Sequence, residues 1–430
     1  MPSRLRRLRR LPGRITVEMR RLAVRLLGGP GEDPGRLAAG LVDALSIIAR
    51  EHWRWLRLRP LSGAMVVEQG VLREGGPGVS LDARRAFEMW PEAAGRTVHR
   101  TFPDVRYRVV RDAIVDEYAS SVLVGSDHLL PDHAFELLAT SRIKGASLLH
   151  QGRTRALHRI PGDAPIIERA IHLGGYHAFN WYHWVAEVLP RVTYLARLPE
   201  HLHDVPLLVP VAAARPGSLH DAIVALCPDR MIMPFPTGGT ARVRELVVID
   251  GLVLHPSGFG PGGGPRPDRE LIHVEAMREF RAALRSSLGV ADGIEPGVRI
   301  FIDRDHDPER GYNREQLLDI AGERGFTSVV GAHLTLRDQA ALFARAEFVI
   351  GPNGAGWTNV LFCSPDARGL CWIVPDGMGG PWFRNLGHVA GVELSYLDAE
   401  PRGEGNPLKV DYHVDPTRFA DALDEVIRGW

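Results

Sequence analysis

The stretch FVIGPNGAGWTN, Phe348 to Asn359, places a short apolar run directly before a glycine-rich turn. The run is typical of a buried strand, and the residues after the turn can open a helix. Gly351, Gly354 and Gly356 follow the spacing G-x-x-G-x-G, whereas a dinucleotide-binding turn has G-x-G-x-x-G. A P-loop is excluded too, because Trp357 stands where that motif needs lysine. Two interpretations stay open: a phosphate-binding turn, or a tight turn that needs glycine for its backbone angles.

Helix and strand patterns alternate regularly around this turn. We expect a helix near Glu270 to Leu288, the strand VRIFIDR, a helix from Arg314 to about Arg324, the strand FTSVV, a helix from Leu336 to Ala346 and the strand EFVIG. Continuous Val, Ile and Phe runs between helices indicate strands covered on both faces. The second half of the chain therefore predicts a doubly wound parallel sheet, in which ligands bind at the carboxyl ends of the strands.

The first half shows a less regular α/β pattern. A helix is expected at Arg36 to Arg57, and short β-type runs occupy Val105 to about Leu130. The runs RAIHLGG, VPLLVP and RELVVIDGLVLH indicate further strands around a helical stretch. His255 to Asp268 concentrates Gly and Pro, which predicts a linker between two domains.

The expected fold class is therefore α/β, with six segments. They are a basic tail at 1–30, a helical or irregular extension at 31–104, an α/β domain at 105–257, a linker at 258–268, a second α/β domain at 269–400, and a tail with a helix at 401–430.

Composition excludes several classes of protein. The 430 residues are 45% hydrophobic and 24% charged, which is globular composition. Lys+Arg 52 against Asp+Glu 52 leaves no net charge, so we expect no nucleic-acid partner. Cys227, Cys363 and Cys371 have neither an even count nor metal-ligand spacing, which argues against a disulfide framework or a zinc site and fits a reducing compartment.

The first 29 residues carry nine arginines, between Arg4 and Arg25, against Glu18 alone. Val17, Leu22 and Leu26 can form an apolar stripe, so a helix on anionic lipid and a basic tail without fixed structure are both open. No stretch reaches the roughly 18 apolar residues that span a bilayer. We expect a cytoplasmic protein, with peripheral contact to the inner face of the membrane through Arg4–Arg25. The Arg, Ala, Gly and Pro usage suggests a GC-rich bacterial genome.

A second stretch, FNWYHWVAEVLPR at Phe179 to Arg191, gives the glycine turn a context. Together the two stretches resemble glycosyltransferase family 61, whose members carry N-x-x-H-W-x-x-E-x-L-P-R in the first half and G-P-H-G-A-G-L-T-N in the second. The first motif is complete in Asn180, His183, Trp184, Glu187, Leu189, Pro190 and Arg191. The second is matched by Gly351, Pro352, Gly354, Ala355, Gly356, Thr358 and Asn359. Two further segments resemble the family: IFIDRDHDPERGYNREQL, through Arg304, Arg310, Asn313 and Glu315, and LTLRDQAALFARA, through Gln339. The resemblance covers roughly Val105 to Leu397.

The resemblance implies a GT-B fold, two Rossmann-like domains facing a cleft, with the donor on the second domain and the acceptor on the first. It implies an inverting transfer of a hexose or pentose from a nucleotide diphosphate to a hydroxyl of a glycan or lipid-linked acceptor, in surface-polysaccharide or capsule assembly, with no cofactor and no metal. DRDHD at Asp303 to Asp307 fits a turn as well as a D-x-D metal site. The implied donor-binding residues are Arg304, Gly351, Asn353, Gly354, Ala355, Gly356, Thr358, Asn359 and Asp376. The implied acceptor or cleft residues are Asn180, Trp184 and Arg191.

His183 and Glu187 are the expected catalytic residues. An inverting transfer needs a base for the acceptor hydroxyl, and imidazole can serve near neutral pH. With Asn180 as N-cap, His183 falls in the first helical turn and Glu187 one turn further on the same face, placed to orient the ring. The alternative, Glu187 as the base itself, stays open. Asn313 with Gln316, and Thr335 with Asp338, read as helix caps with capping boxes.

Three departures from the family pattern bear on activity. Asn353 replaces a usual histidine, Asp303 a usual serine, and Trp372 an acidic residue expected to hold donor hydroxyls. Asp376 is the nearest replacement for that carboxylate. The departures admit an alternative: a catalytically silent scaffold that binds a nucleotide sugar or a glycan. An NAD-dependent dehydrogenase is disfavoured by the glycine spacing.

Overall fold

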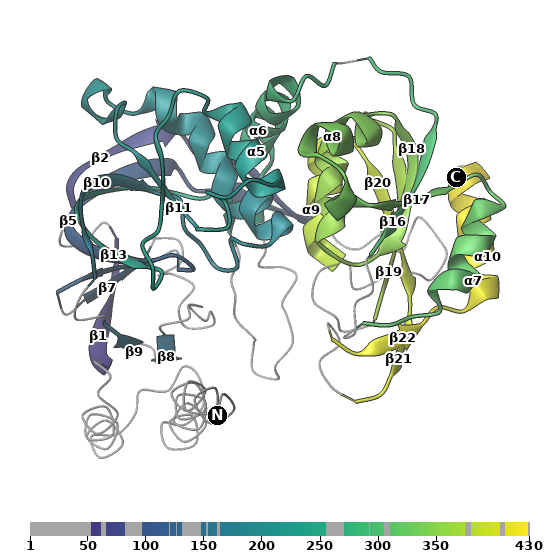
Figure 1. Cartoon of the computed structure of the whole chain (residues 1–430), viewed down its shortest axis with the longest axis horizontal. Coiled ribbons are helices and arrows are strands. Elements are labelled where there is room, and N and C mark those ends of the chain that lie inside the picture. Colours follow the sequence, from purple (N-terminus) through teal and green to yellow (C-terminus); the bar gives the residue numbers. More distant parts are fainter. Residues whose placement is uncertain are drawn as a thin grey trace, which may run out of the picture.

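The computed structural model describes residues 53–61, 66–81, 97–119, 121–125, 127–130, 148–151, 154–160, 164–254, 271–291, 293–304, 310–374, 380–404 and 409–428. The predictions for the basic tail, the Gly/Pro linker and Asp376 lie outside these residues. The described chain forms two halves that lie side by side (Figure 1).

The second half contains the predicted doubly wound sheet. Its strands are β16 (Val298–Asp303), β17 (Thr327–Val330), β18 (Ala346–Pro352), β19 (Arg368–Ile373) and β20 (Glu393–Asp398). They are all parallel, in the order β17-β16-β18-β19-β20. The helices are α7 (Arg314–Gly322), η6 (Gly331–His333), α8 (Leu336–Ala344), η7 (Ala355–Phe362), α9 (Gly380–Ala390) and α10 (Pro416–Arg428). Helices α7 and α10 lie on one face of the sheet, and α8 and α9 on the other (Figure 1).

Alternation along β16 explains why helices cover both faces. Ile300 and Ile302 join the large apolar cluster on the α8 and α9 side, whereas Phe301 joins a second cluster with Leu317 of α7 and Phe419 of α10. Successive side chains of a strand point to opposite faces, so an unbroken apolar run requires two covered faces. The prediction for this half of the chain is confirmed.

The strand order also fixes where a ligand can bind. The chain runs from β16 outward to β17 and returns past β16 to β18, so the connections leave β16 and β18 on opposite faces of the sheet. The carboxyl ends of these two neighbouring strands therefore form a switch point, where doubly wound sheets hold their ligands.

The first half is built on a large mixed sheet. Among the described residues this sheet has eleven strands, in the order β12-β11-β10-β13-β5-β6-β7-β1-β9-β8 with β2 paired to β5. Their bounds are β1 (Trp53–Pro60), β2 (Val66–Arg73), β5 (Val105–Asp116), β6 (Val122–Val124), β7 (Asp127–Leu130), β8 (Leu148–Gln151), β9 (Arg155–Arg159), β10 (Ile166–His172), β11 (Leu207–Val209), β12 (Ile232–Pro234) and β13 (Thr240–Ile249). Strands β12, β11, β10 and β13 form a parallel run that ends where β13 pairs antiparallel with β5, and β1 and β7 form a separate parallel pair. This half is thus Rossmann-like in part only.

Smaller elements join the halves. A four-stranded sheet has the order β14-β15-β3-β4, from β3 (Gly76–Leu81), β4 (Thr97–Phe102), β14 (Val253–Leu254) and β15 (Leu271–His273). Helix α5 (Ser218–Leu226) packs against α8, and α6 (Val274–Ser287) against α9. One apolar cluster contains residues of both halves, for example Trp184 and Phe362. The remaining elements are η2 (His183–Val188), η3 (Leu189–Arg197), η4 (Glu200–Leu202), β21 (Glu400–Arg402) and β22 (Asp411–His413).

Two local predictions are wrong in the described residues. Of the helix expected at Arg36 to Arg57, only residues 53–57 are described, and they belong to strand β1. There buried Leu56 and Leu58 alternate with exposed Arg57 and Arg59, a period-2 pattern. The extension at 31–104 contains strands β1 to β4 in its described part. The helix expected near Glu270 to Leu288 is confirmed as α6, which begins at Val274 directly after β15. Helix α6 contacts η3 and β3 of the first half and α9 of the second, so it lies at the junction of the two halves.

Candidate active site

A cavity of about 470 Å³ opens at the carboxyl ends of β16, β17 and β18. Its walls come from both halves of the chain. The lining residues are Phe179, Trp181, Ser218, Leu219, Ile302, Asp303, Arg304, Arg310, Val329, Val330, Gly331, Ala332, Gln339, Phe343, Pro352, Gly354, Ala355, Gly356 and Asn359. The cavity thus occupies the switch point, and the predicted glycine turn forms one side of it.

The glycines of the turn permit a close approach of chain segments. A Cβ on Gly351 would lie 2.7 Å from the Cβ of Ile302 and 2.9 Å from its carbonyl oxygen, and a Cβ on Gly356 2.9 Å from Ile302 Cγ2. None of Gly351, Gly354 and Gly356 is among the glycines with positive φ, and Gly354 is extended at φ 170. Of the two interpretations, the need for unusual backbone angles is therefore wrong: β16 packs directly against the turn.

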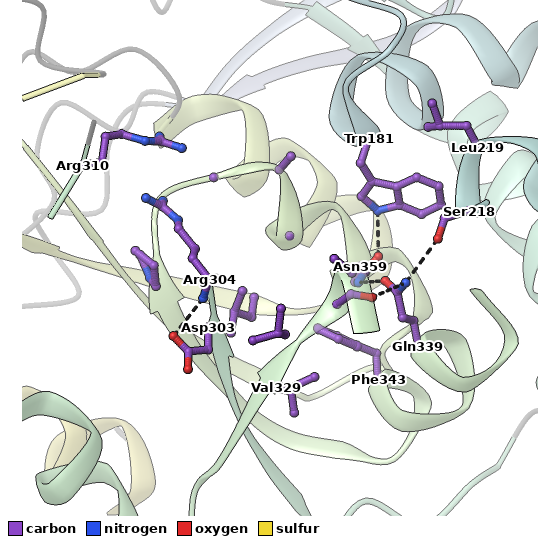
Figure 2. Close-up of a pocket in the computed structure, with 18 of the residues that line it drawn as sticks. Trp181, Ser218, Leu219, Asp303, Arg304, Arg310, Val329, Gln339, Phe343 and Asn359 are labelled. Atoms are coloured by element: carbon purple, nitrogen blue, oxygen red, sulfur yellow. Dashed lines mark hydrogen bonds between the residues drawn. The ribbon is translucent and has the colours of Figure 1, made fainter. Parts of the chain in front are cut away.

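Arg304 leaves the end of β16 and reaches the turn. Its Nη2 donates to the carbonyl oxygen of Asn353, and its guanidinium lines the cavity. Arg310 lines the same part of the site (Figure 2). An arginine fork beside backbone N–H groups suits a phosphate or diphosphate. Asp305 and Asp307 of the DRDHD stretch lie outside the described residues.

Asp303 anchors the start of this loop. Its carboxylate accepts from Nε of Arg314 at 2.8 Å, from Ser328 Oγ at 2.5 Å and from the backbone N–H of Arg304 at 2.8 Å. Burial opposes ionisation, but these hydrogen bonds prevail and lower the pKa of Asp303 below its usual value. The residue that replaces a family serine is thus an ionised anchor that positions Arg304.

A chain of side-chain hydrogen bonds crosses between the halves (Figure 2). Trp181 Nε1 donates to Asn359 Oδ1 at 2.8 Å, and Asn359 Nδ2 donates to Gln339 Oε1 at 2.9 Å. Gln339 Nε2 lies 3.3 Å from Ser218 Oγ and donates to the carbonyl of Gly331 at 2.9 Å. Asn359, predicted to bind the donor, therefore commits both ends of its amide to protein partners and links the two motifs.

The first motif folds as the cap prediction requires, but not as a regular α-helix. Asn180 Oδ1 accepts from the N–H of Tyr182 at 3.0 Å, so Asn180 caps the segment. From His183 to Val188 the chain is π-helical, and from Leu189 it continues as a 3₁₀ helix with Pro190 in its first turn. Single π turns inside helices occur frequently at functional sites.

His183 and Glu187 form the predicted pair. His183 Nδ1 lies 2.9 Å from Glu187 Oε1, and each side chain is 15% exposed. Neither residue lines the cavity itself. The His183 ring lies edge-on to His177 at 5.6 Å and faces Trp382 of α9 at 6.4 Å, so it sits between the two halves beside the cavity wall.

Arg191 lies in η3, which follows this pair in the chain, and is buried. Its Nη1 donates to the carbonyl of Gly174 at 3.2 Å. Burial lowers the pKa of Arg191 to about 10, against the attraction of Asp250 and Glu187. Arg191 was predicted at the acceptor or cleft, but it is 8% exposed and absent from the cavity wall, so it acts on Glu187 through its charge.

Other predicted residues are in the core. Trp184 is fully buried and donates its indole N–H to Leu219 O at 3.0 Å, so it does not face an acceptor. Trp372 is fully buried against Phe301 and Phe419, which keeps its ring out of the donor site. Thr358 is 1% exposed and outside the cavity wall.

The two predicted capping boxes differ in outcome. Thr335 Oγ1 accepts from the Asp338 N–H at 3.2 Å, which confirms the cap. The Asn313 side chain makes no cap; it pairs with both backbone groups of Val414. Asn313 stands at the N-cap position of α7 and donates to Gln316 Oε1 at 3.1 Å, but its side chain accepts from no helix N–H, because its oxygen accepts from Val414 after β22.

Several wall residues were not among the predicted site residues. Ser218, Leu219, Phe179 and Trp181 complete the cavity from the first half, and Val329 to Ala332 from the end of β17. The signal available for the β17 residues was their place after a parallel strand. Within the residues that the structure describes, no group of three or more His, Cys, Asp or Glu side chains is arranged to hold a metal ion. None of the helices in this same part of the chain is long and apolar enough to cross a membrane.

The chain was compared with models of known protein families. The family model of glycosyltransferase 61 matches residues 181–370, from Trp181 on the cavity wall to Leu370 in β19. The matched region contains the His183–Glu187 pair, Arg304 and the glycine turn, and this match confirms the resemblance to glycosyltransferase family 61. Members of such a family use a sugar donor and an acceptor. A comparison with curated proteins gave no match.

Proposed function

We propose that this protein transfers a hexose or pentose from a nucleotide diphosphate to a hydroxyl group with inversion, in surface-polysaccharide or glycoconjugate assembly. The observation that supports this most is the cavity at the switch point, because one wall carries the glycine turn and two arginines and the opposite wall begins the motif that contains His183. In this proposal the halves work as a GT-B pair, with the donor held by the second half.

The donor fits the cavity in a defined direction. The diphosphate lies against Arg304, Arg310 and the backbone N–H groups at Gly354 to Gly356, where arginine forks and peptide dipoles favour anions. The nucleoside lies toward the more apolar wall formed by Val329, Ala332 and Phe343. The arginines neutralise the leaving diphosphate, so the proposal needs no metal and no cofactor.

His183 is the general base in this mechanism. The acceptor oxygen attacks the anomeric carbon from the face opposite the diphosphate, its proton passes to His183 Nε2, and the nucleoside diphosphate leaves with the electrons of the broken C–O bond. Because Glu187 accepts from Nδ1, the neutral ring keeps Nε2 as the nitrogen that takes a proton. Glu187 thereby orients the base and compensates the charge that forms on it.

Binding titrations test the donor site. Calorimetry with UDP, GDP, TDP and NAD should show one preferred nucleoside diphosphate, and Arg304→Ala should weaken it by about tenfold or more. Arg244→Ala is a matched control, because Arg244 is more than half exposed on β13 and pairs only with Glu168 in the described structure. Binding of NAD alone, or an unchanged affinity in Arg304→Ala, would remove the basis of the proposal. A chain that binds the nucleotide but transfers no sugar would be the silent scaffold.

The arginine-rich tail carries a second part of the proposal, contact with the inner face of a membrane where lipid-linked acceptors reside. Near an anionic surface each arginine contributes about 1 kcal/mol before salt screening. Removing residues 1–29 should abolish sedimentation with anionic vesicles at low salt. Equal sedimentation of the full and truncated chains would exclude this anchor.

A further inference from the structure

Phe179 places an aromatic ring in solvent at the edge of the cavity. Its exposed fraction is 52%, and it is the one aromatic among the large hydrophobic residues that are exposed in the described part of the chain. It also lines the cavity, together with Trp181 two residues later. An exposed ring beside a site of polar and charged groups is a common feature of ligand recognition rather than of folding.

Neighbouring rings hold Phe179 in a fixed orientation. Tyr118, which follows β5, contacts it edge-on, with ring centroids 5.4 Å apart and an interplanar angle of 89°. His177 contacts it at 5.1 Å and 46°. Such edge and tilted contacts are the favoured geometries of aromatic pairs, so the ring is organised before any ligand arrives.

His177 connects this ring to the base. Its own ring stacks on Tyr176 at 3.8 Å and lies 5.6 Å from the ring of His183. Its backbone has φ 51, the left-handed region that residues other than glycine rarely adopt and that is common at functional sites. A ligand lying over Phe179 and His177 therefore spans the distance between the donor cavity and His183.

We propose that Phe179 and His177 form an acceptor subsite that stacks the apolar face of a pyranose ring, so that the acceptor is a glycan. The inference rests on the proposed function and names its acceptor class. One fixed ring, flanked by the polar aromatic side chains of Tyr118 and His177, matches the size and the mixed polarity of a single sugar ring. A lipid chain would need a continuous apolar groove, whereas the cavity that Phe179 lines also carries polar side chains such as Ser218 and Gln339.

A glycan array probed with the full chain tests the subsite, with and without saturating UDP or GDP. We expect retention on pyranose-containing glycans, a loss of at least tenfold in Phe179→Ala, and retention of most binding in Phe179→Trp, which keeps a stacking face. Met231→Ala is the matched control, since Met231 is 68% exposed and does not line the cavity. Titration of the same variants with the nucleoside diphosphate reports the donor site separately.

Two results would overturn the inference while the donor site stands. One is nucleotide binding without retention of any glycan, and the other is equal retention by the wild type and Phe179→Ala. Retention of glycans that depends on Phe179, in a chain that binds no nucleotide, would support the subsite and contradict the proposed transfer.

Discussion

Trp181 and Asn359 lie in different halves of the protein, and the indole N–H of Trp181 donates to the side-chain oxygen of Asn359 at 2.8 Å. Trp181 belongs to the motif with the proposed base, and Asn359 is the last residue of the motif that contains the glycine turn. The bond therefore fixes the two catalytic segments relative to each other, and Gln339 holds the second end of the same amide.

Removing the indole donor should weaken this junction. In Trp181→Phe the buried oxygen of Asn359 loses its donor, a change that typically costs about 1–3 kcal/mol of unfolding free energy. Urea denaturation of Trp181→Phe, Asn359→Ala and the double variant measures the coupling, which we expect at about 0.5–3 kcal/mol. Strictly additive single effects would show that the two side chains do not act together.

Gly351 should not tolerate a methyl group. Because its Cβ would lie 2.7 Å from Ile302 Cβ and 2.9 Å from a backbone oxygen, Gly351→Ala must separate β16 from β18 and should cost about 1–3 kcal/mol. Gly322→Ala is the matched control: Gly322 lies in α7 with nothing within 4 Å of the added carbon. That control should gain about 0.5–1 kcal/mol. Thermal melts of equal stability for both variants would contradict the close packing of the turn.

Two buried histidines predict a loss of stability in mild acid. Burial lowers the pKa of His128 and of His172 to about 3, so each is neutral in the folded state, whereas each binds a proton below about pH 6.5 when unfolded. Stability from this source is complete above pH 6.5 and falls as the pH drops from 6.5 toward 3, by about 2 kcal/mol per histidine at pH 5. The Asp303 carboxylate does not take part in this loss between pH 6.5 and 5. Because its pKa is lowered in the folded state, the stability that it contributes is lost only below about pH 4.

Denaturation of the wild type and His172→Gln at pH 7 and pH 5 checks the sign. The variant should lose about 2 kcal/mol less between the two pH values. An equal loss in both proteins would place the acid sensitivity elsewhere.

Arg191 should be required for folding stability more than for donor binding. It is a buried cation near Asp250 and Glu187, and removing one partner of a buried charge cluster costs about 3–5 kcal/mol. Arg191→Met should approach that loss, whereas Arg197→Met, at the exposed end of the same 3₁₀ helix, should change stability by at most about 1 kcal/mol. A small loss of unfolding free energy in Arg191→Met would mean that Glu187 and Asp250 do not depend on this cation.

The second half of the fold was predictable because its strands are continuous apolar runs. Ile300, Phe301 and Ile302 already require two covered faces. The first half was predictable in part: the runs that form β5, β10, β11 and β13 were recognised, but β1 to β4 were not, since their burial depends on partners in other elements, as β2 pairs with β5. Local patterns carry no information about such pairings.

The site shows the same division. The His183–Glu187 pair and Asn180 as cap follow from spacing within one helical turn, and both are present. The commitment of Asn359 to Trp181, across 178 positions, depends on how the halves pack and could not be read from either motif. The burial of Trp184 and Trp372 likewise depends on neighbours from distant elements.

The most direct test of the account is turnover of sugar transfer in His183→Ala and Glu187→Gln beside the wild type, followed by release of the nucleoside diphosphate. A general base contributes about 10² to 10⁴ in rate, so His183→Ala should lower kcat by that order, with nucleotide affinity and melting temperature nearly unchanged. Glu187→Gln keeps an oxygen that can accept from Nδ1 and should retain more turnover than His183→Ala. Near-wild-type turnover in His183→Ala, together with an inactive Glu187→Gln, would contradict the account and identify Glu187 as the base.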